Sequence, residues 1–98
     1  GSGEFIIPVT NGTAFTINNP VNATGGNQYP KGAKLVVTFV NTSGGAMGAI
    51  TWGNNFKLAT FTGPATAKNQ SITFTNASVY GSANVWREVS RTAADVPN

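Results

Sequence analysis

Cysteine and histidine are both absent from this 98-residue sequence. Without cysteine, the chain has no disulfide framework and no thiol nucleophile. Without histidine, histidine-based catalytic triads and the common zinc sites are excluded. We therefore expect a domain that is held together by its core or by oligomerisation, and that binds no cofactor and no metal.

Acidic residues are scarce as well, with three carboxylates in all. Glycosidases normally use two carboxylates that flank the scissile bond. Glu4 lies in the opening segment GSGEF, which is typical of a cloning remnant, and Asp95 lies in the C-terminal tail, so Glu88 is the one interior acid. Because a single chain lacks a carboxylate pair, we expect no enzymatic activity; an active site shared between chains is the remaining catalytic alternative.

Charge of either sign makes up only 9% of the residues, and the net charge is +3. The cations are spread along the sequence rather than clustered: Lys31, Lys34, Lys57, Lys68, Arg87 and Arg91. Phosphate-backbone binding normally uses a basic stripe, so no nucleic-acid partner is expected. No segment approaches the ~20 apolar residues that span a bilayer, so membrane insertion is not expected either.

What the sequence does contain is apolar residues at every second position in short runs, as in KLVVTFV and SITFT. This spacing is typical of β-strands, and β-branched and aromatic residues fill the runs. Turn formers such as NTSGG and TGPATAKN separate them, and no window favours a helix. The predicted strands lie near residues 5–10, 13–18, 33–41, 46–52, 56–62, 70–76 and 84–91.

Seven short strands with frequent turns predict an all-β fold, either a small antiparallel β-sandwich or a jelly-roll-like barrel. We set residues 1–5 aside as the cloning remnant and assign residues 6–98 to a single domain. The longest irregular segment, residues 18–32, is either a binding loop or a plain connection between sheets.

The stretch AITWGNNFKL, residues 49–58, has two interpretations. Aromatic rings beside amides and a cation could form a sugar-binding platform. The same residues also fit the tip of a hairpin, with residues 53–55 as the loop and Trp52 opposite Phe56. Alternation then places four large apolar side chains on one face, which favours a core role for Trp52: Ile50, Trp52, Phe56 and Leu58. The candidate binding residues that remain for solvent are Asn54, Asn55 and Lys57.

A second candidate lies in NVWREVSRT. On a regular strand, Arg87 and Arg91 share one face while Glu88 lies on the other. The two arginines could then form a fork for an anionic sugar or a partner's carboxylate. The structural alternative, which we favour, is a surface ion pair with Glu88.

Four segments occur in a recognisable order: NTSGGAMGAITWG after a strand, then FKL, then PATAKNQSITFT, and finally WREVSRTAADVPN. In these segments, which cover roughly the last two thirds of the chain, the sequence resembles the small C-terminal β domains of bacteriophage tail spike and tail fibre proteins and of related prophage or bacterial surface proteins. The resemblance implies a β-sandwich at the distal end of a trimeric fibre, in the virion and outside the cell. It also implies a role in trimer assembly or in contact with a host-surface polysaccharide.

The sequence departs from that family in TNASVYGSANVW, where the usual connection is a short turn like YDGTNW. The longer segment carries Tyr80, whose ring could stack on a sugar, and Arg87 stands where the family often has an apolar residue. We expect a trimer, because small size, the lack of disulfides and the symmetry of the fibres that the sequence resembles favour one. The apolar lead-in FIIPV is our candidate for a buried contact with neighbouring chains, since it opens the domain where a shaft would enter. Two other function classes stay open: a carbohydrate-binding module of a secreted bacterial enzyme, and a capsid or virion decoration domain.

Overall fold

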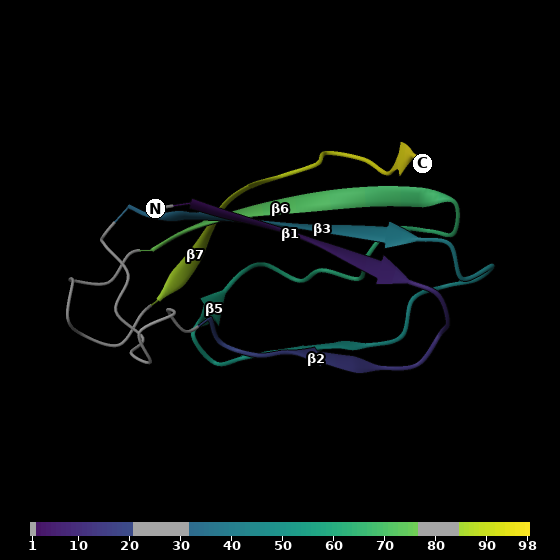
Figure 1. Cartoon of the computed structure of the whole chain (residues 1–98), viewed down its shortest axis with the longest axis horizontal. Coiled ribbons are helices and arrows are strands. Elements are labelled where there is room, and N and C mark those ends of the chain that lie inside the picture. The colour runs from purple at the N-terminus through teal and green to yellow at the C-terminus, as the bar shows by residue number, and fades with distance from the viewer. Residues whose placement is uncertain (1, 21–31, 77–84) are drawn as a thin grey trace.

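The computed structural model describes residues 2–20, 32–76 and 85–98, and in these residues every regular element is a β-strand (Figure 1). The strands are β1 (Ser2–Val9), β2 (Phe15–Ile17), β3 (Lys34–Asn41), β4 (Ile50–Trp52), β5 (Phe56–Lys57), β6 (Lys68–Asn76), β7 (Trp86–Arg91) and β8 (Val96–Pro97). The predicted all-β fold is confirmed. Each of the seven predicted strands has a counterpart, and β8 adds a short pairing that the sequence analysis left in the tail.

Two sheets form the two layers of the fold (Figure 1). The main sheet has the order β1-β3-β6-β7-β5, with β8 pairing the other end of β6 beyond β7, and the small sheet consists of β2 and β4. The sheets are mixed rather than purely antiparallel, because β1 pairs β3, β2 pairs β4 and β5 pairs β7 in parallel. Parallel neighbours need a crossover connection. The connections of β1 to β3 and of β2 to β4 pass through the other sheet, whereas β5 reaches β7 through β6 of the main sheet.

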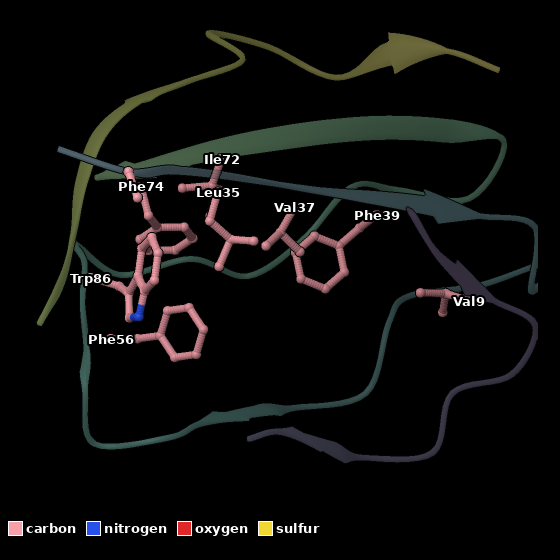
Figure 2. Packing of buried hydrophobic residues seen from close by; sticks show 9 residues of the cluster. Val9, Leu35, Val37, Phe39, Phe56, Ile72, Phe74 and Trp86 are labelled. Carbon is pink, nitrogen blue, oxygen red and sulfur yellow. The ribbon is translucent and has the colours of Figure 1, made fainter. Parts of the chain in front are cut away.

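The hydrophobic core lies between the two layers. Strand β3 shows why this sequence forms a strand, since after the exposed Lys34 its side chains alternate between buried and partly buried along KLVVTFVN. Its inward residues meet those of β6, and Figure 2 shows their side chains pointing to the interior with Trp86 and Phe56 closing one end. Complete burial of one such large apolar side chain contributes about 1.5–3 kcal/mol, so this cluster is the main stabilising feature of the fold.

Asn41, in the NTSGG segment, is a buried polar residue that ends β3. Its Nδ2 donates to the carbonyl oxygens of Gly45 and Pro64, each at 3.0 Å. Its Oδ1 accepts from the backbone N–H of Ser43 at 2.9 Å and from the Ser43 hydroxyl at 2.7 Å. Because every polar atom of the side chain is satisfied, these hydrogen bonds offset the desolvation penalty of burial, and the turn is fixed to the segment around Pro64.

Strand β1 is an edge strand of the main sheet, and it includes residues 2–5, which the sequence analysis set aside. The FIIPV segment is therefore paired with β3 in its own chain and is not a detached arm. Val9 is buried and Ile7 packs against the core, whereas Phe5 and Ile6 are 58% and 64% exposed. Only the exposed part of the segment remains for a contact between chains.

Candidate functional site

The stretch TWGNNFK forms a corner between the two sheets, so the predicted hairpin is wrong. Strand β4 pairs β2 and strand β5 pairs β7, and the two strands do not pair with each other. A turn closes the corner, with the Phe56 N–H donating to the Gly53 carbonyl at 3.0 Å. The turn was predictable from glycine and asparagine, but the sheet that the chain enters next depends on contacts far away in the sequence.

Asn19, which was not among the predicted site residues, holds this corner. Its Nδ2 donates to Asn54 Oδ1 and its Oδ1 accepts from the Asn55 N–H, both at 2.9 Å. Gly53 lies so close that a Cβ built there would be 2.3 Å from Asn19 Oδ1, so only glycine fits without movement. The one sequence signal was the asparagine pair before Pro20, since asparagine amides commonly imitate backbone hydrogen bonds in turns.

Trp52 packs against the core, as predicted, and is partly buried. Its ring centroid lies 5.1 Å from that of Phe56, 5.7 Å from that of Phe74 and 6.0 Å from that of Phe39. The Phe56 and Phe39 contacts are edge-to-face, the geometry that aromatic pairs prefer. The ring that could have stacked on a saccharide is therefore engaged in packing.

The predicted binding residues of this corner differ in how far they remain accessible. Asn54 and Lys57 are exposed, whereas Asn55 is half-buried and its backbone carbonyl accepts from the backbone N–H of Trp86 at 2.8 Å. Lys57 is the register partner of Arg87, which is also exposed. The structure thus brings two predicted site residues, one from each candidate stretch, to neighbouring positions on the outer face of the main sheet.

The prediction that Arg87 and Arg91 share one face is wrong, because they lie on opposite faces of β7, and the alternative of an arginine fork is thereby contradicted. The pairing of β6 with β7 contains a bulge: Thr73 pairs Ser90 and Phe74 pairs Glu88, so Val89 is an additional residue. An additional residue reverses the alternation beyond it. Glu88 and Arg91 consequently share the inner face, where their inward register partners are Phe74 and Ile72.

Arg91 and Glu88 form the ion pair that we favoured, and it is partly buried. Arg91 Nε binds Glu88 Oε2 and Nη2 binds Oε1 at 2.8 Å, in a bidentate arrangement. The guanidinium also donates to the carbonyl oxygens of Ala59 and Thr60 at 3.1 and 3.0 Å, and lies 5.3 Å from the Phe61 ring centroid. With these partners, Arg91 fixes the connection after β5 against β7.

This environment shifts the pKa of both partners in the directions that keep them charged. The hydrogen bonds from Arg91 hold the pKa of Glu88 below its usual value, against an opposing effect of burial, and the Ala59 N–H adds to the lowering. The same pair raises the pKa of Arg91. A carboxylate that is kept ionised in this way is poorly suited to donate a proton as a general acid.

Asp95 is also held by neighbours, its Oδ2 accepting from the Ala65 N–H at 2.9 Å and its Oδ1 from Gln70 Nε2 at 2.6 Å. Within the described ranges no group of three or more histidine, cysteine, aspartate or glutamate side chains could hold a metal ion. No helix in the described part of the chain is long and apolar enough to cross a membrane.

Tyr80 lies outside the described residues. An open groove of about 380 Å³ lies between the end of β1 and the start of β2. None of the predicted site residues lines it.

Comparison with known proteins found no matching family model, no matching curated protein and no matching solved structure. The function is therefore argued from the accessible side chains and the sheet edges.

Proposed function

We propose that this chain is a non-catalytic terminal domain of a phage tail spike or tail fibre protein, which supports trimer assembly and attachment to a host-surface glycan. The observation that carries the proposal is the free edge of β1. Among the residues that the structure describes, this eight-residue strand has a partner on one side only, and it carries the 64% exposed Ile6. Natural proteins normally cover or blunt such an edge.

The edge is suited to a side-chain contact rather than to a long added strand. Pro8 lies within β1 and has no N–H to offer, and proline inside a strand is confined to edges and bulges. Ile6 lies on the outer face of the main sheet, because its register partner Thr38 alternates with the inward residues Val37 and Phe39. An apolar side chain beside a blunted edge favours burial against a second copy of the chain.

The attachment half of the proposal depends on exposed polar groups near the β5 corner. Asn54 offers an amide with both donor and acceptor capacity, and Lys57 and Arg87 offer cationic donors. Single contacts of this kind contribute about 0.5–1.5 kcal/mol each, so useful affinity needs several copies presented together. Trimer assembly and glycan attachment therefore support each other.

The absence of catalysis is part of the proposal, and the engagement of the carboxylates supports it. Glu88 is bound by Arg91 and Ala59, and Asp95 by Ala65 and Gln70. The two groups therefore have structural partners in place of a substrate.

A glycan array combined with a molar-mass measurement of the same sample tests the proposal. We expect a trimer that binds surface polysaccharides and leaves them intact. A monomer that binds glycans would contradict the assembly role and favour the carbohydrate-binding module. A trimer that binds no glycan would contradict the attachment role.

A further inference from the structure

The strand registers bring three cations into one row across the main sheet, although these residues are far apart in the sequence. Lys34 of β3 pairs Thr75 of β6, Thr75 pairs Arg87 of β7, and Arg87 pairs Lys57 of β5. We call Lys34, Thr75, Arg87 and Lys57 the basic row. Neighbouring strands are about 4.8 Å apart, so the row extends over roughly 14 Å.

The basic row lies on the outer face. The residues next to it in sequence point inward and are buried: Leu35, Phe56, Phe74 and Trp86. Side chains alternate between faces along a strand, so the row residues point to the opposite side. Lys34, Lys57 and Arg87 are exposed, and their backbones are held by the core beneath them.

The charge of the row is not neutralised within the described part of the chain. Among the described residues, the ion pair with an N–O distance within 4.0 Å is that of Arg91 with Glu88, on the inner face. Asp95 is bound by Ala65 and Gln70, and Glu4 pairs Val36, one outward position along β3 from Lys34. The row therefore presents net positive charge to solvent.

The arrangement is unfavourable for folding alone. Arg87 and Lys57 are direct cross-strand partners, and like charges in such positions destabilise a sheet. A chain with only 9% charged residues could avoid the repulsion with any of its abundant neutral polar residues. Solubility alone does not require the charges to be adjacent, whereas an anionic ligand would relieve the repulsion.

We infer that the basic row makes this domain selective for acidic polysaccharides, with carboxylates of uronic-acid type, over neutral ones. The inference rests on the attachment role proposed above and specifies its ligand. Arginine binds a carboxylate through two parallel hydrogen bonds, and the lysines on either side act as point charges. The exposed Asn54 supplies its Nδ2 donors, and the Thr75 hydroxyl, which donates to the Ala33 carbonyl at 3.3 Å, supplies an acceptor for the neutral hydroxyls between acidic groups.

The dimensions favour a polysaccharide over a nucleic acid. A typical nucleic-acid site neutralises about 6–10 closely spaced phosphates, and bases stack on exposed aromatic rings in single-strand sites. The row offers three cations and contains no aromatic residue. Sparse charge with hydroxyls between the charged groups matches an acidic sugar chain.

The test is binding of the full chain, by calorimetry or biolayer interferometry, to three probes: polygalacturonate, dextran and a DNA duplex. We expect polygalacturonate to bind at low salt, dextran to bind at least tenfold more weakly, and the binding to weaken as salt is raised. Arg87→Gln, Lys34→Gln and Lys57→Gln should each weaken polygalacturonate binding about two- to fivefold, and the triple variant should abolish it.

Lys68→Gln is the matched control, because it removes the same charge at the opposite end of β6. An equal loss in Lys68→Gln, or equal binding of the DNA duplex, would show that net charge alone drives the binding and would overturn the inference. A protein that binds neutral glycans on the array but not polygalacturonate would overturn the inference and leave the proposed attachment role intact. Failure to bind any glycan would overturn both.

Discussion

At the scale of single residues, three polar side chains hold irregular segments of this domain in place through hydrogen bonds. Asn41 fixes the turn after β3, Asn19 fixes the corner before β5, and Arg91 fixes the connection after β5. Each side chain supplies a hydrogen-bond partner to a backbone group of an irregular segment, which has no partner strand to provide one. In a protein with few charges and no cysteine, hydrogen bonds from amide and guanidinium groups thus connect segments that lie far apart in the sequence.

Close backbone approaches give a direct test of the packing between β2 and β4. A Cβ at Gly48 would lie 2.4 Å from the Thr13 carbonyl carbon, whereas a Cβ at Gly45 would meet nothing within 4 Å. We predict that Gly48→Ala lowers the free energy of unfolding by about 1–3 kcal/mol, because backbone atoms must move. Gly45→Ala should change it by less than about 0.5 kcal/mol. Urea denaturation measures the free energy of unfolding of both variants. Equal effects would contradict the close contact between Gly48 and the backbone of Thr13.

The Glu88–Arg91 pair predicts a pH dependence of stability. Because the folded-state pKa of Glu88 is lowered, its contribution is complete above the unfolded-state pKa of about 4.3 and is lost as the pH falls through the lower folded value. Thermal melts of the wild type should therefore show a loss of stability below about pH 4.3, which Glu88→Gln reduces. Arg87→Gln, which leaves the pair intact, should retain the wild-type slope. If stability fell with pH as steeply in Glu88→Gln as in the wild type, the Glu88–Arg91 pair would not be a cause of the acid destabilisation.

At the scale of elements, alternation in the sequence was sufficient to find strands but not their partners. KLVVTFV and SITFT were predicted because each buries one face of a strand, a local property. The corner at residues 53–55 and the bulge at Val89 were missed for a common reason. Both depend on which strand lies alongside, and an additional residue leaves no mark in the amino-acid pattern of β7.

The corner nevertheless preserves the predicted role of Trp52, because the turn itself brings Trp52 and Phe56 into contact. We predict that Trp52→Ala lowers the free energy of unfolding by about 3–5 kcal/mol through lost core packing. Asn54→Ala, at an exposed position of the same corner, should cost no more than about 1 kcal/mol. Denaturation curves compare the two variants. A Trp52→Ala protein of wild-type stability with impaired glycan binding would return the tryptophan to the sugar-platform interpretation.

At the scale of the whole molecule, the cations form a pattern that the sequence did not reveal. Spacing along the chain suggested scattered charges, yet strand register places Lys34, Arg87 and Lys57 in one row. The exposed Ile6 on β1 lies on the same outer face of the main sheet, at the opposite edge from β5. One face of the domain therefore combines a candidate assembly contact with a candidate ligand surface.

The measurement that tests the central proposal most directly is molar mass against concentration, by light scattering, for the wild type, Ile6→Lys and Val96→Lys. Ile6 and Val96 are both exposed apolar residues, at 64% and 44%, but they lie on β1 and β8 respectively. We predict that the wild type and Val96→Lys have three times the 10.1 kDa mass of one chain, and that Ile6→Lys is a folded monomer. A wild-type protein that stays monomeric at every concentration, or an Ile6→Lys protein that remains a trimer, would contradict assembly through the edge of β1.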